Sequence, residues 1–309
     1  MTARTNDLEC WKLFCLVVEK QGLNAAADFA DIEPSRLSRV INSLEAELGR
    51  PLQTTSFGDQ AYAMAKALLA QHALMLETLK DDKDRMEGLI TLAIPAGIGP
   101  LFVTPQLLEF LQIFPKIEFE LITLTSKAEE VFYNHPEKVV HVSIGYGVPG
   151  TGDIVSRYSG KMEFIPCCSP SYIKKHGHIV DPSECAVHTG LSYTGGTRTK
   201  TQELQNGGVV KQLKWKKSLS FQSLSDLKNA CLLGAGIAGD IPLIHCIDEL
   251  EEGKLVNVLR GWKRPAAGCY LYSTKHFVEY RRVKTFLDWM AEKHREILEQ
   301  IDNRFGQLA

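Results

Sequence analysis

The chain has 309 residues, a hydrophobic content of 44% and a formal net charge of −2. This length and apolar content allow two or three domains with sizeable cores. No stretch reaches the apolar length of a membrane span, and the polar opening at residues 1–7 is not a secretion signal. We therefore expect a cytoplasmic protein with no membrane partner.

The cysteines and histidines give no sign of metal or catalytic chemistry. The eight cysteines include no Cys-x-x-Cys pair, and no histidine stands at zinc spacing. Adjacent Cys167 and Cys168 lie in a predicted strand, so their side chains should point to opposite faces. A redox role for this pair is the weaker alternative to buried, reduced thiols. We predict no catalytic residues, no metal and no cofactor, and hence no enzyme.

Two short helices near the N-terminus predict a helix-turn-helix. Residues 24–30 form an alanine-rich helix, residues 31–33 are long enough only for a turn, and Pro34 suits the first position of the next helix. In that second helix, one apolar stripe recurs at helical spacing: Leu37, Val40, Ile41, Leu44 and Leu48. The polar side chains that point elsewhere include Ser35, Arg36, Ser38 and Arg39.

A long helix follows the predicted helix-turn-helix. Residues 59–87 contain no proline or glycine and are rich in strong helix formers. An apolar seam with coiled-coil spacing runs along them: Ala61, Ala65, Leu68, His72, Met75 and Leu79. The seam needs a partner, which is either the rest of the same chain or the same helix of a second copy. We favour the second copy.

From residue 89 the pattern changes to strands alternating with helices. Residues 89–95 and 117–124 read as strands, and residues 105–111 between them read as a helix. Residues 139–144 predict a further strand, which ends in the glycine-rich segment 145–150. Right-handed crossovers of this kind predict a mostly parallel sheet covered by helices.

Open α/β sheets bind ligands at the carboxyl ends of their strands, where helix N-termini also point. Two capping boxes follow predicted strands, one starting at Ser126 and one at Ser223. We expect these N-termini to grip a small organic anion, most readily a carboxylate. The candidate contacts are Thr125, Ser126, Gly145, Tyr146, Tyr193, Gln222 and Ser223. The alternative is that the polar members only cap helices and the tyrosines only pack under loops.

The order of these motifs resembles the LysR-type transcriptional regulators of bacteria over nearly the whole chain. The matching stretches are residues 8–18, 25–27, 38–39, 43–49, 139–150, 230–242 and 250–259. The resemblance implies a winged helix-turn-helix head at 1–58 and a linker and dimerisation helix at 59–88. It further implies two α/β subdomains of periplasmic-binding-protein type, the first at 89–161 with 268–309 and the second at 162–267.

The resemblance implies a DNA-binding regulator that senses a small-molecule effector between its two subdomains. Ser35, Arg36, Ser38 and Arg39 would contact DNA, and the protein would be a homodimer or homotetramer. Its fold class would be α/β.

Two departures from the family pattern leave a second function open. Residues 50–58 are too short for the family's β-hairpin wing, and residues 1–60 carry six cations against nine carboxylates, a net charge of −3. Because DNA affinity depends on neutralised phosphates, such a head should bind DNA weakly or through few cations. The alternative function is a ligand-binding relative that has lost most DNA binding and acts through protein contacts or heterodimers.

Overall fold

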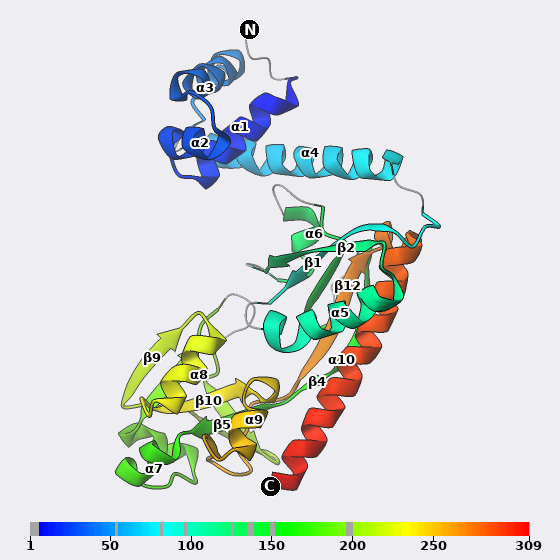
Figure 1. The fold of residues 1–309 in the computed structure, drawn as a ribbon. Helices are drawn as coiled ribbons and strands as arrows, with labels where there is room; N and C mark the ends of the chain where they lie inside the picture. The colour runs from blue at the N-terminus through cyan, green and yellow to red at the C-terminus, as the bar shows by residue number, and fades with distance from the viewer. Residues whose placement is uncertain are drawn as a thin grey trace. The chain divides into compact units, whose positions relative to one another are not determined.

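The computed structural model describes residues 6–52, 55–80, 83–95, 98–124, 127–134, 139–148, 152–195 and 200–308. They fall into two units (Figure 1). One unit lies within residues 1–82 and 132–140, and the other within residues 83–131 and 141–309.

The first unit begins with the predicted helix-turn-helix. Its helices are α1 (Leu8–Glu19), α2 (Leu23–Ala30) and α3 (Pro34–Leu48). The apolar stripe of α3 faces inward, with Leu37, Ile41 and Leu44 at most 1% exposed. Asp31 and Gly49 end α2 and α3 in the left-handed conformation. The prediction of two helices joined by a tight turn is confirmed.

The connection from α3 to the next helix is short and closely packed. Leu52 is buried, and its backbone N–H donates to the Glu45 carboxylate at 2.8 Å. At Gly58 a Cβ atom would lie 1.6 Å from the Leu52 carbonyl oxygen, so only glycine allows this approach. Gly49–Leu52 and Thr55, the connecting residues that the structure describes, contain no strand. The described part of the head thus has no wing strand, as the short sequence indicated.

Helix α4 (Ser56–Lys80) continues the first unit. Ala65 and Leu69, 4% and 8% exposed, join the apolar core made by α1 to α3. The helix is shorter than predicted, because residues 83–87 are not helical. Instead, the Lys83 carbonyl accepts a hydrogen bond from the Arg281 N–H at 2.8 Å, and the Lys83 side chain pairs with Glu279. These contacts hold residues 83–87 against the start of helix α10 (Arg281–Leu308).

The second unit contains two five-stranded sheets. The first has the strand order β2-β1-β3-β12-β4, in which β1 is parallel to β2 and β3, and β12 is antiparallel to β3 and β4. Its predicted strands and the helix between β1 and β2 are present. The bounds are β1 (Gly88–Ile94), α5 (Thr104–Ile113), β2 (Ile117–Thr123), β3 (Val142–Tyr146), β4 (Ile154–Met162) and β12 (Ala267–Thr274). Helix α6 (Val131–Asn134) begins in this unit, and its residues 132–134 belong to the first unit.

The second sheet has the order β11-β5-β10-β6-β9. Two segments connect the two sheets, one after β4 and one before β12. Lys263 of the second segment donates a hydrogen bond to the Glu163 carboxylate of the first at 3.0 Å. Strands β7 and β8 form a separate two-stranded sheet. The bounds are β5 (Phe164–Cys168), α7 (Pro170–His176), β6 (Thr189–Tyr193), β7 (Glu203–Asn206), β8 (Val209–Gln212), β9 (Lys217–Phe221), α8 (Leu224–Leu232), β10 (Ile237–Pro242), α9 (Ile247–Glu251) and β11 (Val256–Asn257).

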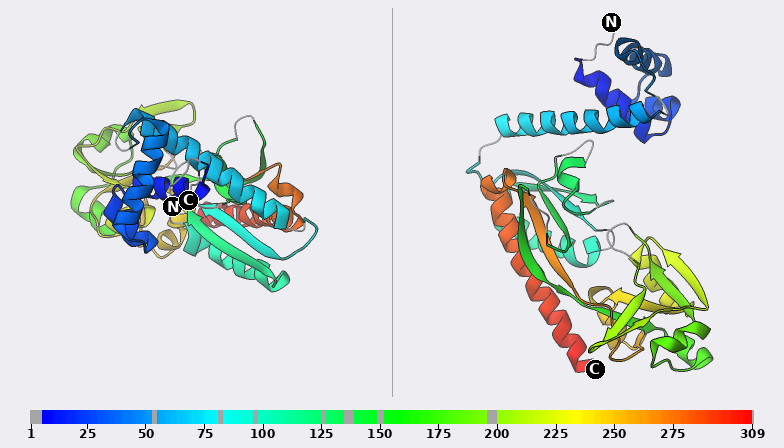
Figure 2. Two further views of the ribbon diagram at one scale, coloured as in Figure 1. Left: turned by 90° about the horizontal axis from the view of Figure 1, so that it is seen from above. Right: turned by 180° about the vertical axis from the view of Figure 1, so that it is seen from behind.

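Helix α10 (Arg281–Leu308) contacts both sheets of the second unit (Figure 2). Near its start it contacts β12 and β4, and Phe286 is fully buried. Its last turns reach the second sheet, where Ile301 joins the apolar core and Arg304 pairs with Asp248 and Glu251 at 2.6 Å. The resemblance assigned 268–309 to the first subdomain, yet the end of this helix packs on the second.

Among the described residues, no helix combines the length and the apolar character needed to cross a lipid bilayer.

Candidate functional site

The outward face of α3 carries the four residues predicted to contact DNA. Ser35, Arg36 and Arg39 are exposed, and Ser38 is partly exposed. The Arg39 Nε donates to the Ser35 carbonyl at 3.2 Å, and the Ser35 hydroxyl donates to the Glu33 carboxylate at 3.2 Å. Within the described chain, no residue pairs with Arg36. The outward face of α3 therefore presents two guanidinium groups to solvent. That of Arg36 has no partner among the described residues, and that of Arg39 makes one hydrogen bond.

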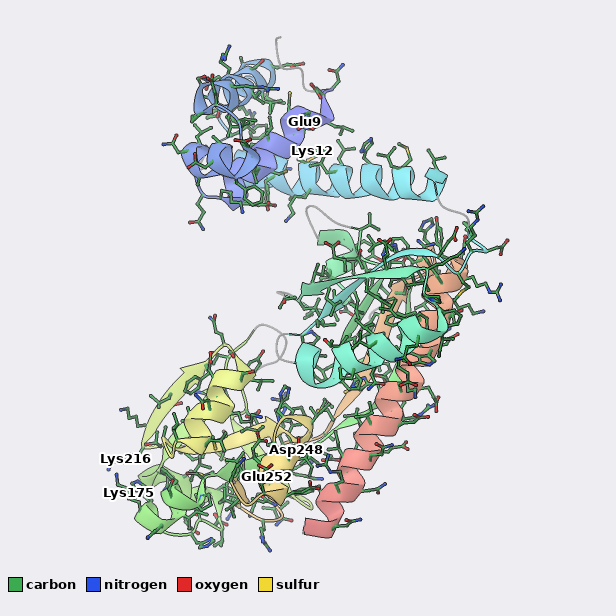
Figure 3. All side chains as sticks on the ribbon, viewed as in Figure 1. Glu9, Lys12, Lys175, Lys216, Asp248 and Glu252 are labelled. Carbon is green, nitrogen blue, oxygen red and sulfur yellow. The ribbon has the colours of Figure 1, made fainter. Side chains whose placement is uncertain are left out.

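The other cations near the first helix have acidic or aromatic partners. Lys12 pairs with Glu9 at 3.3 Å across one turn of α1 (Figure 3). The Nζ of Lys66 lies 3.7 Å from the Glu19 carboxylate, and Arg50 lies over the Phe57 ring. Among the described cations of the head, Arg36 and Arg39 alone have neither an acidic nor an aromatic partner.

Helix α4 exposes an apolar stripe beyond the part that packs on the head. The stripe residues are Met64, Leu68, Met75 and Leu79, with 67%, 48%, 50% and 76% of their surface exposed. Their spacing of four, seven and four places them on one helix face. The predicted seam differs, because Ala65 faces the head core and Met64 takes its place on the outer face.

A cavity of about 210 Å³ lies at the carboxyl edge of the first sheet. It is lined by Pro95, Leu124, Lys127, Ala128, Glu129, Gly145, Tyr146, Val148 and Tyr272. Two of the predicted effector contacts, Gly145 and Tyr146 at the end of β3, thus line the same cavity. A Cβ atom on Gly145 would lie 2.4 Å from the Ala128 Cβ, so glycine is required where these segments meet.

The cavity lining carries both signs of charge. Lys127 is exposed and Glu129 is half-buried. The Tyr272 hydroxyl donates to the Gly147 carbonyl, and burial, with the nearby Glu129 carboxylate, raises the pKa of this phenol. Tyr272 therefore stays protonated at neutral pH. An ammonium group, a carboxylate and a protonated phenol thus line the cavity.

The remaining predicted effector contacts are elsewhere or outside the described residues. Thr125 and Ser126 are not among the described residues, although Leu124 and Lys127 on either side of them line the cavity. Ser223 caps α8, its hydroxyl accepting from the Asp226 N–H at 3.2 Å. This capping role agrees with the simpler alternative.

Tyr193 and Gln222 stand at the carboxyl ends of β6 and β9 in the second sheet. Tyr193 is buried, and its hydroxyl would lie 2.1 Å from a Cβ atom on Gly195, so the ring is covered by its own loop. Gln222 is exposed. Neither residue is in the described lining of the 210 Å³ cavity, and nor is Ser223.

Sequence reasoning missed three residues with polar side chains in the lining, Lys127, Glu129 and Tyr272. A signal existed for the first two, because both lie within the capping box that starts at Ser126. Tyr272 comes from β12, far away in the chain, and only the pairing of β12 with β3 brings it to this edge.

All eight cysteines are buried, and none forms a disulfide. Burial raises the pKa of four thiols to about 12: Cys15, Cys168, Cys185 and Cys269. Among the described residues, no group of three or more His, Cys, Asp or Glu side chains is arranged to hold a metal ion. The thiols are therefore packing residues in this structure.

We expect the native protein to react slowly with a thiol reagent such as dithionitrobenzoate at about pH 8, near the ordinary thiol pKa. Burial blocks access and keeps the thiolate population small, because a raised pKa favours the protonated form. All eight thiols should react rapidly after unfolding in guanidinium. Rapid reaction of Cys167 or Cys168 in the native protein would instead support the redox alternative.

Comparison with known proteins decides the family. The model of the bacterial regulatory helix-turn-helix proteins of the LysR family matches residues 8–56, and the model of the LysR substrate-binding domain matches residues 83–295. The chain belongs to the LysR family of bacterial transcriptional regulators. Transcription regulation, a DNA-binding helix-turn-helix and an effector-binding domain follow from this membership. LysR-type regulators bind DNA and small-molecule effectors and form oligomers.

Individual relatives agree over almost their full length. The HTH-type transcriptional regulator YhjC of Escherichia coli K12 is 27% identical over 308 residues, covering 95% of this chain and all of YhjC. The full-length structure of the Vibrio cholerae virulence activator AphB is 22% identical with a TM-score of 0.59, covering 92% of this chain and 98% of AphB. The structure of CrgA of Neisseria meningitidis is 22% identical with a TM-score of 0.58, covering 94% of this chain and 99% of CrgA. At these identities the two structures establish a shared fold.

Proposed function

We propose that this LysR-type regulator binds DNA through the outward face of α3, dimerises through α4, and responds to a small organic acid in the 210 Å³ cavity. The observation that carries the proposal is that cavity, which lies at the strand ends where open α/β sheets bind ligands. We further propose that the protein acts in the cytoplasm and catalyses no reaction. We propose the same domains that the resemblance implies, with one change. The last turns of α10 belong with the second subdomain, because they pack on the second sheet.

The lining of the cavity indicates the chemical class of the effector. Its volume is below the usual range for drug-sized ligands, so the effector is small. Lys127 favours a carboxylate, whereas Glu129 favours a hydroxyl or ammonium donor on the same molecule. A hydroxy acid or an amino acid satisfies both groups.

Binding would act by differential affinity. An effector that binds one arrangement of the second unit more tightly than another shifts the population toward that arrangement. Ala128 and Glu129 line the cavity, so a ligand bound there would contact them directly.

A thermal-shift screen of small hydroxy, amino and dicarboxylic acids tests the effector site. We expect some of these acids to raise the melting temperature by mass action on the native state. The substitution Lys127→Glu should weaken binding about tenfold or more, since a hydrogen bond to a charged group contributes about 1.5–3 kcal/mol.

The matched control is Lys275→Glu, which makes the same charge change at an exposed residue outside the cavity lining. It should leave the affinity for the acids unchanged. Equal loss in both variants would show that net charge rather than the cavity governs binding. Unchanged affinity in Lys127→Glu would place the effector elsewhere.

A further inference from the structure

A second and larger cavity lies where the end of α10 meets the second sheet. Its volume is about 610 Å³, within the range of small-molecule sites. It is lined by Ile165, Pro166, Leu250, Gly253, Leu255, Val256, Asn257, Arg260, Gly261, Trp262, Lys263 and Phe305. This set shares no residue with the lining of the 210 Å³ cavity at the first sheet.

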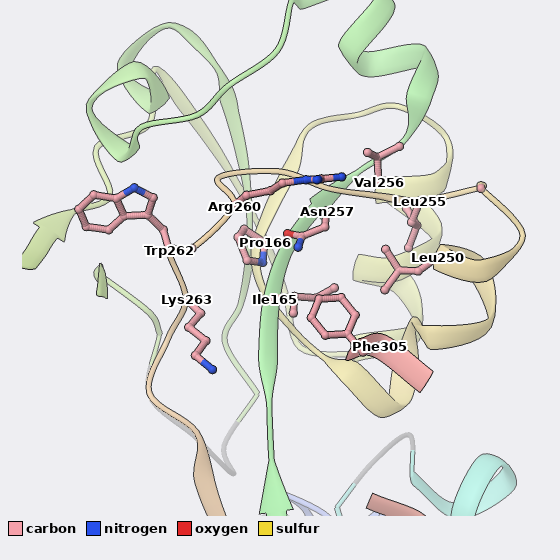
Figure 4. Close-up of a pocket in the computed structure, with 12 residues that line it drawn as sticks. Ile165, Pro166, Leu250, Leu255, Val256, Asn257, Arg260, Trp262, Lys263 and Phe305 are labelled. Atoms are coloured by element: carbon pink, nitrogen blue, oxygen red, sulfur yellow. The ribbon is translucent and has the colours of Figure 1, made fainter. Parts of the chain in front are cut away.

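One wall of this second cavity is apolar. Ile165 of β5 and Phe305 of α10 lie next to each other, and Leu250 and Leu255 lie opposite them (Figure 4). Together these side chains can bury a hydrocarbon or aromatic body of a ligand, which is favourable because apolar surface is removed from water.

The other wall carries positive charge. Arg260 stretches its guanidinium over Asn257 along the edge of the cavity (Figure 4). In the part of the chain that the structure describes, no residue pairs with Arg260. Lys263 is already engaged by Glu163 at 3.0 Å. The described lining contains no Asp or Glu, so an anion entering beside Arg260 meets no carboxylate.

Asn257 supplies a second polar feature of this wall. Its Oδ1 atom is buried and accepts no hydrogen bond from any described residue. A buried acceptor without a donor is costly, because it has lost its hydrogen bonds to water and gained none in return. A ligand that carries an N–H or O–H group near its anionic end would remove this cost.

We propose that this cavity is a second ligand site, separate from the effector cavity, for an amphipathic organic anion. The anionic group binds Arg260, a neighbouring N–H or O–H donates to Asn257, and the apolar body packs on Ile165, Leu250 and Phe305. Because Phe305 belongs to α10, the ligand ties the end of this helix to the second sheet. This inference does not rest on the proposed effector or on DNA binding.

The test uses the full chain and the dye 8-anilinonaphthalene-1-sulfonate, which combines an aromatic body, an N–H and a sulfonate. We expect saturable binding to a single site with strong enhancement of dye fluorescence. The substitution Arg260→Glu should weaken dye binding at least tenfold. The matched control Lys254→Glu reverses a charge in the same region at an exposed residue outside the lining, and should bind the dye like the parent.

Two further measurements make the test decisive. Decanoate should displace the dye, whereas decylamine should not, because only the anion is attracted to Arg260. Lys127→Glu, which disables the effector cavity, should leave dye binding unchanged. Dye affinity that survives Arg260→Glu, displacement by decylamine as readily as by decanoate, or loss of dye binding in Lys127→Glu would each overturn the inference, whatever the fate of the effector proposal.

Discussion

Negative charges at the centre of the α4 stripe should convert the protein from a dimer to a monomer. Leu68 and Met75 are 48% and 50% exposed and lie on one face of the helix. In the proposed dimer they would be buried against the partner helix. The double variant Leu68→Glu with Met75→Glu replaces two apolar side chains in each subunit of the dimer. It should weaken association roughly 1000-fold, at about 1 kcal/mol for each of these half-exposed side chains. Sedimentation over a range of protein concentrations measures the change.

The control is Ala63→Glu, an exposed position on another face of α4. It adds charge to the same helix without entering the stripe, and should leave the dimer intact. The thermal stability of the double variant's head should also be preserved, because Ala65 and Leu69 hold α4 on the core. A double variant with the parent's mass would show that dimerisation uses another surface.

Loss of the α3 guanidinium groups should remove most of the DNA affinity. Arg36 has no partner among the described residues, and Arg39 is held only by the Ser35 carbonyl. We expect Arg36→Ala and Arg39→Ala each to weaken binding to the upstream region of the protein's own coding sequence about tenfold or more, a cost of roughly 1–3 kcal/mol. Titrations at several salt concentrations should give a shallow slope, since few cations displace counterions.

Lys12→Ala provides the matched control. Lys12 is an exposed cation of the same unit, but it pairs with Glu9 at 3.3 Å. Its loss should change DNA affinity little. If the parent binds DNA with a steep salt slope, or if the α3 variants bind as well as the parent, the DNA surface is elsewhere. If the parent binds no DNA at all, the alternative of a regulator acting through protein contacts gains support.

The net negative charge of the head should make its DNA binding depend on few contacts. A net charge of −3 over residues 1–60 repels DNA at long range, and the described head has no wing strand to add phosphate contacts. Recognition would then depend on short-range contacts of α3 and on two heads binding together. Dimerisation through α4 and DNA binding through α3 are therefore coupled, and the monomeric variant should also bind DNA weakly.

Local sequence patterns determined the elements of this protein. The spacing of Leu37, Ile41 and Leu44 fixes which face of α3 is buried, and therefore which face is left for Arg36 and Arg39. The alternation of strands and helices after residue 89 predicted the parallel strands β1, β2 and β3 of the first sheet, because hydrophobic periodicity and turn residues act within a few positions of each other. The prediction of a mostly parallel sheet was wrong for the other half of this sheet, where β12 is antiparallel to β3 and β4. Each of these signals is complete within one helix or one strand.

The tertiary structure alone decided how distant segments share surfaces. The α4 seam predicted from spacing was partly wrong about its faces, because Ala65 packs on α1 to α3 and leaves Met64 outside. Tyr272 joins Gly145 at the effector cavity only because β12 returns beside β3, and Phe305 joins Ile165 only because α10 extends onto the second sheet. Contacts of this kind depend on chain topology and packing, and the periodicity of a single segment contains no information about its distant partner.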